Sequence, residues 1–250
     1  MKSLHVVLLF ITMVFACSDN NFPEADAIIN KSIEVSGGKR FEHSTIDFDF
    51  RDRHYKAIRD KGYFLLTRTT LVGSDTIVDA LNSKDDFIRY RNQKKIQLHD
   101  TMAVKYKSSV NAVHYFSVLP YRLNDDAVNK TYISKTKIND TEYHKIKVTF
   151  NAEGGGEDFE DVFVYWINAD TFKADYIAYS YAESDGIGYR FREAYNERYI
   201  NGIRFVDYNN YKPKGSNIDL MAMDRLFEQK ALNLLSKVEL ININVQVSDY

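Results

Sequence analysis

The sequence predicts a mainly β fold with a few helices, built from a long antiparallel meander. Segments of alternating apolar and polar residues recur along most of the 250-residue chain and are separated by short turns, as in hairpins. The chain has 18 Tyr and 16 Phe but only 3 Pro. Tyr and Phe favour strands, whereas Pro interrupts their hydrogen-bond ladders, so the composition also predicts sheets with an aromatic-rich interior or groove.

The first 16 residues predict an export signal. Lys2 supplies a positive charge, residues 4–15 are almost wholly apolar, and Ala16 is a small residue suited to cleavage. The apolar run is shorter than the roughly 20 residues that a membrane-spanning helix needs. We therefore predict a signal peptide over residues 1–16, and no later stretch of the sequence is apolar over a comparable length.

Cys17 is the only cysteine, and it directly follows this apolar run. The string "VFAC" at 14–17 predicts a lipobox, in which the thiol carries a lipid and the chain is cut before the cysteine. An ordinary signal-peptidase site is the alternative, because Val-x-Ala suits that enzyme as well. In the lipobox interpretation, residues 17–23 form a lipidated N-terminus and tether that holds the chain on a membrane. Residues 24–250 then form a single half-barrel domain.

The first half of this domain is predicted to contain two helices and a series of hairpins. Residues 24–36 form an amphipathic helix that Gly37-Gly38 ends. Strict alternation begins at residue 44 and continues through short turns to about residue 92. Residues 101–117 carry an imperfect helical stripe that stops before Pro120. His114, within this helix, is interpreted as a buried, hydrogen-bonded side chain.

The second half returns to strands after residue 130. Its turns include Asn201-Gly202, the dipeptide most typical of a two-residue hairpin. Residues 220–235 are interpreted as a short helix and turn, and residues 236–247 as one last alternating strand. Several of these strands are apolar on both faces, as in "VFVYWI" at 162–167. Both faces must therefore be covered, by helices on one side and by a second sheet, the sheet's own interior or an apolar guest on the other.

No motif in the sequence assigns a reaction. There is no paired-histidine metal motif and no serine-nucleophile motif, so no catalytic residue, metal or cofactor is assigned. Gly154-Gly155-Gly156 lacks the end of a phosphate loop and has acidic neighbours; it is interpreted as a solvated hairpin loop, with cation binding as the alternative. The formal net charge of −2 leaves no broad basic surface for nucleic acid.

Arg190 and Arg192 alternate with Tyr189 and Phe191 on one predicted strand. If the sheet curves, the two arginines point into its hollow, where they can clamp a carboxylate or phosphate head group. The alternative is that they pair with the many Asp and Glu side chains on adjacent strands.

Several long strings along the chain resemble a family of bacterial envelope lipoproteins of unknown function. They are "FDFRDRHY", "NAVHYFSVLPYRLNDDAVNK", "YHKIKVTFNAEGGGEDFEDVFVYWI", "DYIAYSY" and "GYRFREAYNERYINGIRFVDYNNY". That family is distantly similar to the lipoprotein carriers of the LolA/LolB type. The resemblance implies a curved antiparallel sheet that forms an unclosed barrel covered by helices, with a cavity that holds acyl chains. It implies no functional residue, because no position of this sequence maps onto a known functional position of those carriers.

Together these features give the hypothesis of an exported lipoprotein of the cell envelope, expected at the outer membrane. It is expected to be a monomer, anchored through its N-terminal lipid, that binds a lipid or other apolar ligand in the concave face of the half-barrel. The candidate ligand-binding residues are Phe48, Phe50, Tyr63, Leu65, Trp166, Tyr176, Tyr189, Phe191, Phe205, Arg190 and Arg192. An envelope interaction or scaffold module without a ligand is the alternative, and a hydrolase acting on an envelope component is the second.

Overall fold

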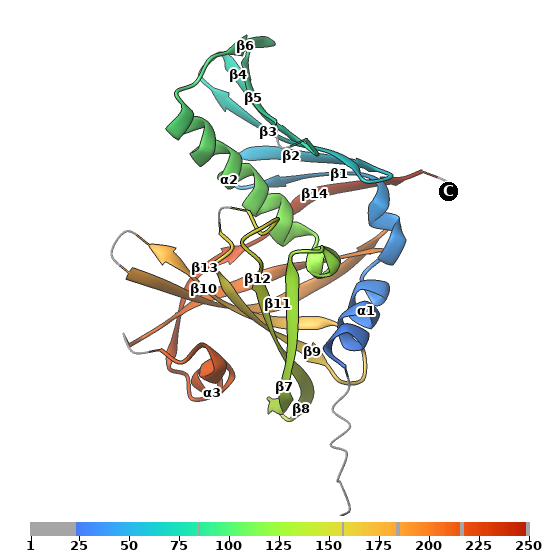
Figure 1. The fold of residues 1–250 in the computed structure, drawn as a ribbon, viewed down its shortest axis with the longest axis vertical. Helices are drawn as coiled ribbons and strands as arrows, with labels where there is room; N and C mark the ends of the chain where they lie inside the picture. The colour runs from blue at the N-terminus through green and yellow to red at the C-terminus, as the bar shows by residue number, and fades with distance from the viewer. Residues whose placement is uncertain (1–23, 85, 157, 184–185, 216–217, 249–250) are drawn as a thin grey trace, which may run out of the picture.

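The strands form two antiparallel sheets of seven strands each, and neither sheet closes into a barrel (Figure 1). This computed structural model describes residues 24–84, 86–156, 158–183, 186–215 and 218–248. The mainly β, antiparallel and unclosed architecture predicted from the sequence is confirmed.

Sheet A contains the first six strands and the last one, in the order β14-β1-β2-β3-β4-β5-β6. Its strands are β1 (His43–Phe50), β2 (Arg53–Asp60), β3 (Tyr63–Val72), β4 (Asp75–Asn82), β5 (Phe87–Arg91), β6 (Lys94–Ile96) and β14 (Ile241–Val247). Most neighbours are joined by tight turns, but β14 returns from the end of the chain to pair with β1. Sheet A therefore joins the two ends of the domain.

Sheet B is a continuous meander in the order β13-β12-β11-β10-β9-β8-β7. Its strands are β7 (Val128–Ile138), β8 (Thr141–Phe150), β9 (Val162–Asn168), β10 (Ala174–Glu183), β11 (Gly186–Ile200), β12 (Ile203–Pro213) and β13 (Leu232–Val238). The prediction of one last strand over residues 236–247 is wrong. This segment breaks at 239–240, so that its start completes β13 in sheet B and its end forms β14 in sheet A.

The described helices are α1 (Ala25–Val35), η1 (Gly38–Glu42), α2 (Asp100–Ser117), η2 (Tyr121–Asn124), η3 (Leu220–Ala222) and α3 (Met223–Glu228). The three α-helices among them lie where the sequence predicted helices, whereas η1 and η2 were not predicted and residues 232–235, expected in a helix and turn, belong to β13. Gly37 follows α1 with φ of 137°, a value that glycine adopts more readily than other residues, and this ends the helix. None of the helices in the described ranges is both long and apolar enough to cross a membrane.

Sheet B is covered on both faces, as its two-sided apolar pattern predicted. We call inner the face that carries Phe163, Tyr165, Ile177 and Tyr179, which packs against α1, η2 and the end of α2. We call outer the opposite face, which carries Val164, Trp166, Ala178 and Phe191 and packs against η3 and α3. Figure 1 shows α2 running between the two sheets, with α1 and α3 at either side of sheet B.

The helix α2 is fixed to sheet A by a buried charged cluster. Arg68 on β3 donates to Asp79 on β4 at 2.6 Å and to the hydroxyl of Ser109 on α2 at 2.7 Å. His114 on α2 is buried and donates from Nε2 to the carbonyl oxygen of Thr67 at 3.0 Å, which confirms the interpretation of that histidine. Burial lowers the pKa of His114 to about 3, so its ring is neutral near pH 7.

Candidate functional site

Two cavities lie between the sheets, one on each side of the last turns of α2. The first, which we call the arginine cavity, has a volume of about 410 Å³. Its walls come from β1, α2 and strands β10 to β13, so it spans the gap between sheets A and B. Residues that line it include Phe50, Val113, Phe116, Tyr179, Arg192 and Val206.

The second cavity, which we call the glycine-loop cavity, has a volume of about 650 Å³. It lies between α2, the ends of β7 and β8, and the loop that connects β8 to β9. Residues that line it include Tyr115, Phe116, Phe150, Gly155, Asp161 and Phe163. Ala112, Phe116, Asp158 and Asp161 border both cavities, which therefore meet at the end of α2.

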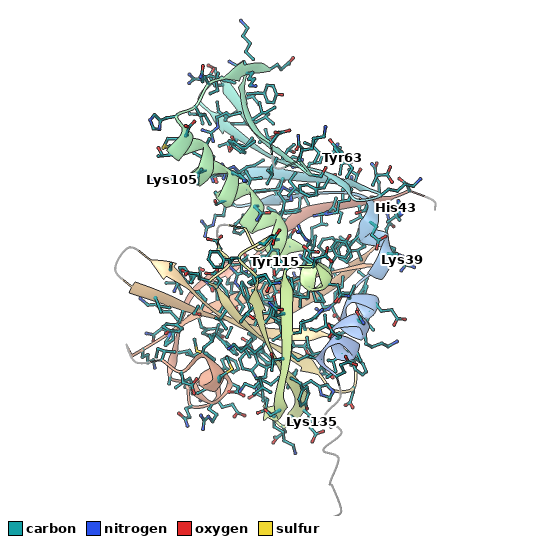
Figure 2. All side chains as sticks on the ribbon, viewed as in Figure 1. Lys39, His43, Tyr63, Lys105, Tyr115 and Lys135 are labelled. Atoms are coloured by element: carbon teal, nitrogen blue, oxygen red, sulfur yellow. The ribbon has the colours of Figure 1, made fainter. Side chains whose placement is uncertain are left out.

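Aromatic packing places the end of α2 between the cavities. Tyr115 and Phe116 are consecutive and both reach the inner face of sheet B. The ring of Tyr115 lies 6.3 Å from that of Phe163, and the ring of Phe116 lies 5.2 Å from that of Tyr179, measured between centroids. Figure 2 labels Tyr115 at this junction of α2 with sheet B. Phe116 thus forms the partition between the two cavities.

Arg192 has the most enclosed guanidinium of the arginine cavity, whose lining also includes Arg51, Asp158 and Asp161. It lies on β11 opposite Ile177, so its side chain emerges from the inner face. Its guanidinium carbon lies 3.9 Å from the ring centroid of Phe116, and Nη2 donates to the hydroxyl of Tyr179 at 3.0 Å. Its Nε and Nη1 are buried and have no hydrogen-bond partner. No acidic residue in the described part of the chain pairs with this arginine.

Other buried polar atoms lie on the same side of the sheet. Oδ1 of Asn210 is buried without a hydrogen bond, and the buried hydroxyls of Tyr115 and Tyr165 face each other. Burial raises the pKa of Tyr115 to about 12 and that of Tyr165 well above its usual value, so both hydroxyls stay protonated at neutral pH. A buried polar atom without a partner costs about 1–3 kcal/mol, so a cluster of them marks a place where a partner is missing.

Asp161 adds a titratable carboxyl to the wall shared by both cavities. Burial, together with the neighbouring negative charge of Asp158, raises the pKa of Asp161 to about 7. At neutral pH this carboxyl is therefore about half protonated, and the negative charge facing the cavities depends on pH.

The glycine-rich loop is part of the cavity wall. A Cβ on Gly155 would lie 2.2 Å from the carbonyl oxygen of Asn151, so only glycine fits the close turn there. The sequence interpretation as a solvated hairpin loop did not reveal this role, and the crowding that requires glycine is visible only in three dimensions. Among the described residues, no group of three potential metal-ligating side chains occurs in this loop or elsewhere; Glu157 lies outside them.

Of the ligand-binding residues predicted from the sequence, Phe50 and Arg192 line the arginine cavity. Arg190 emerges from the same inner face, with its guanidinium carbon 5.1 Å from the ring centroid of Tyr181.

The other predicted residues lie away from the cavities. Trp166, Tyr176, Phe191 and, partly buried, Tyr189 pack on the outer face, in the core beneath α3. Phe48 and Phe205 are buried where the two sheets join. Tyr63 is 50% exposed and lies with Leu65 on the face of sheet A that points away from α2 (Figure 2). The predicted lipidation site, Cys17, lies outside the described residues.

A third, more open hollow of about 440 Å³ lies beside β12 and β14. Its charged groups are already paired, since Arg198 donates to Asp207 at 2.8 Å and to the carbonyl oxygen of Leu240 at 3.0 Å. These bonds hold the crossing from β13 to β14, so this hollow is a structural joint and the two cavities beside α2 are the candidate site.

Comparisons with known proteins connect the chain to a family and to several solved folds. The sequence model of a family of unknown function, DUF6503, matches residues 2–240. No curated protein matches the chain.

Three solved structures align with the chain at low sequence identity. A DUF1329 family protein from Desulfovibrio piger is 10% identical, with 90% of this chain and 95% of that chain covered and a TM-score of 0.40. A domain proposed as an outer membrane lipoprotein-sorting protein from Vibrio parahaemolyticus is 9% identical, with coverage of 87% and 93% and a TM-score of 0.40. The lipoprotein LppX of Mycobacterium tuberculosis is 12% identical, with coverage of 64% and 88% and a TM-score of 0.28.

Proposed function

The chain belongs to DUF6503, a family of unknown function, and we propose that it binds a lipid or another apolar, chain-like ligand between its two sheets. The ligand lies against the inner face of sheet B, on both sides of Phe116. The observation that carries this proposal is the pair of adjoining cavities, of about 410 and 650 Å³, that meet at the end of α2.

The size and walls of these cavities suit such a ligand. Ligand pockets in proteins are typically about 300–1,000 Å³, mostly apolar and aromatic, with a few polar groups that fix orientation. The arginine cavity has this composition, with Phe50, Val113 and Val206 among its apolar walls and the guanidinium of Arg192 among its polar groups. An apolar chain that fills the space removes apolar wall area from water, which stabilises the complex by about 25 cal/mol per Å².

A substitution that fills the shared space tests this proposal. Ala112 is exposed and borders both cavities, so Ala112→Trp places a large side chain in them without replacing a core residue. Val104, on the first turns of the same helix, is 47% exposed and lines neither cavity, so Val104→Trp is the matched control.

The measurement is the affinity of the purified, delipidated protein for a fluorescent fatty acid. We expect the original protein and Val104→Trp to bind it, and Ala112→Trp to bind it at least about 10-fold more weakly, which corresponds to 1.4 kcal/mol. Extraction of freshly purified protein with organic solvent should also release lipid. The absence of both bound lipid and fatty-acid affinity in the original protein would overturn the proposal.

We further propose that the protein is exported and held in the cell envelope, at the outer membrane, by a lipid on Cys17. The sequence supports this through the apolar leader and the lipobox-like string that ends at Cys17. In bacterial fractions, the original protein is expected with the membranes and Cys17→Ala away from them. Equal membrane association of both proteins, or an unmodified Cys17 in the mass of the mature protein, would contradict anchoring through this residue.

A further inference from the structure

We propose that the ligand carries an anionic oxygen head group, a carboxylate or a phosphate, and that the guanidinium of Arg192 holds it. This inference rests on the proposed function, because it names the polar end of the same ligand. It defines the ligand class as amphipathic acids with one apolar chain or more.

The main support is the incomplete environment of Arg192. A guanidinium has five N–H donors, and Nη2 alone has a hydrogen-bond partner within the described ranges, the hydroxyl of Tyr179 at 3.0 Å. Nε and Nη1 are buried and unbonded. Nε and Nη2 form one two-donor edge of the planar group, and Nη1 and Nη2 form the other, so each of the two unbonded nitrogens can hold an oxygen of a carboxylate or a phosphate beside Nη2.

The surroundings of Arg192 provide aromatic faces, and none of the described carboxylates forms an ion pair with it, although Asp158 and Asp161 line the same cavity. The guanidinium carbon lies 3.9 Å from the ring centroid of Phe116, 5.3 Å from that of Tyr179 and 5.7 Å from that of Tyr208. Stacking on rings stabilises a cation but satisfies none of its N–H groups. Arg68 and Arg204 differ, because they pair with Asp79 and Glu197, whereas Arg59 also has a buried Nη1 without a partner but lines neither cavity. An anion from outside the chain would complete the Arg192 site.

The cavity places its apolar walls beside the unbonded guanidinium, so one ligand can cover the walls with its chain and bind Arg192 with its head group. A chain lying against Phe50, Val113 and Val206 is next to the guanidinium, since all four residues line the same space. Nε and Nη1 are covered in the present arrangement, so Phe116 must shift for a head group to reach them. Phe116 also borders the glycine-loop cavity, which offers its ring about 650 Å³ of space to enter.

The test compares three unlabelled competitors that share one saturated chain and differ in the head group. They are a fatty acid, the matching alkyl phosphate and the matching fatty alcohol, and each displaces a fluorescent fatty acid from the delipidated protein. Arg192→Gln removes the charge, and Arg192→Lys keeps the charge but not the planar donor edge. Arg225→Gln is the matched control, because Arg225 is exposed on α3, on the other side of sheet B.

We expect the original protein and Arg225→Gln to bind at least one of the two acids about 10- to 100-fold more tightly than the alcohol, as for a hydrogen bond to a charged group. The acid that binds more tightly identifies the head group as carboxylate or phosphate. Arg192→Gln should lose this preference while still binding the alcohol, and Arg192→Lys should retain part of it.

Two results would overturn the inference and leave the proposed function standing. The first is equal affinity of the original protein for the acids and the alcohol, a comparison that needs no variant. The second is an unchanged preference in Arg192→Gln, with its thermal unfolding midpoint showing that it is folded. If none of the three competitors binds the original protein, the proposed function itself fails, and this inference fails with it.

Discussion

The two faces of sheet B each bury a positive side chain, and the two environments are opposite. On the outer face, Lys145 donates to Oδ2 of Asp224 at 2.8 Å and to the carbonyl oxygen of Met221, and Trp166 donates to the same carboxylate at 3.1 Å. On the inner face, Arg192 has buried N–H groups without partners. The same sheet thus carries one completed polar cluster and one incomplete cluster.

The difference separates an interior that is complete within the chain from one that the proposed ligand would complete. The outer cluster ties η3 and α3 to the sheet, and the described core around it is closely packed by aromatic rings such as Phe191 and Phe227, whose centroids are 5.0 Å apart. The inner face borders two cavities and keeps unpaired donors. If the proposed ligand leaves the inner face, the outer face with α3 still provides one complete core.

The largest expected effect comes from breaking the outer cluster. Asp224→Ala leaves the Lys145 ammonium buried without a counter-ion and removes the acceptor of Trp166. We expect a loss of about 3–5 kcal/mol in the free energy of unfolding. Urea unfolding measures it, with the exposed Asp126→Ala as control. A loss below about 1 kcal/mol would show that the outer cluster is not the structural side of the sheet.

The second prediction compares one phenylalanine from each face. Phe191 on the outer face is fully buried, whereas Phe116 is partly buried and already borders empty space. We expect Phe191→Ala to cost about 3–5 kcal/mol and Phe116→Ala about 2 kcal/mol, because little new cavity forms beside existing cavities. Urea unfolding of both variants checks this, and equal costs would mean that the inner face is packed as tightly as the outer one.

The third prediction concerns the two buried cations themselves. Arg192→Met removes unpaired donors, at the loss of one hydrogen bond to Tyr179 and the stacking on Phe116, so the free energy of unfolding should change by less than about 1 kcal/mol. Lys145→Met instead leaves Asp224 buried without its cation and should cost about 3 kcal/mol. A large loss of unfolding free energy in Arg192→Met would indicate that this arginine has a structural role. The contrast between the two faces would then disappear.

The sequence predicted the elements of this fold better than it predicted the site. The alternation of apolar and polar residues predicted most strands, and the positions of glycine and proline predicted the ends of α1 and α2. In "VFVYWI", however, both sets of alternate residues are apolar, so alternation does not show which set lies on which face. Phe163 and Tyr165 lie on the inner face, and Trp166 lies on the outer face with α3. The candidate residues were therefore drawn from both faces.

The rest of the site depends on contacts between distant segments. Arg192 is one of many arginines in a chain rich in acids, and only the folded arrangement reveals that none of the described acids pairs with it. Phe116 matched a helical stripe, but its place between two cavities depends on how α2 enters the gap between the sheets. The pairing of β14 with β1 likewise joins residues about 200 positions apart, as Asn244 and Asp47 illustrate, and local patterns carry no sign of it.

The last prediction is a pH dependence of stability, carried by the inner face through Asp161. Its pKa is about 7 in the folded protein, against an ordinary value of 3.8, because burial and Asp158 disfavour its charged form. Between about pH 4 and pH 7 the folded chain holds a proton that the unfolded chain releases, so this group makes stability fall as pH rises through that window. Asp161→Asn carries no such proton, and its stability relative to the original protein should therefore increase from pH 5 to pH 8.

His114 acts in the opposite direction, since its pKa of about 3 makes stability rise with pH up to about 6.5, but it is present in both proteins and cancels in the difference. Urea unfolding at pH 5, 6, 7 and 8 measures that difference, with the exposed Asp126→Asn as control. If the difference in free energy of unfolding between the two proteins stays constant across this range, the Asp161 carboxyl is exposed to solvent. The shared wall of the two cavities would then be more open than the structure indicates.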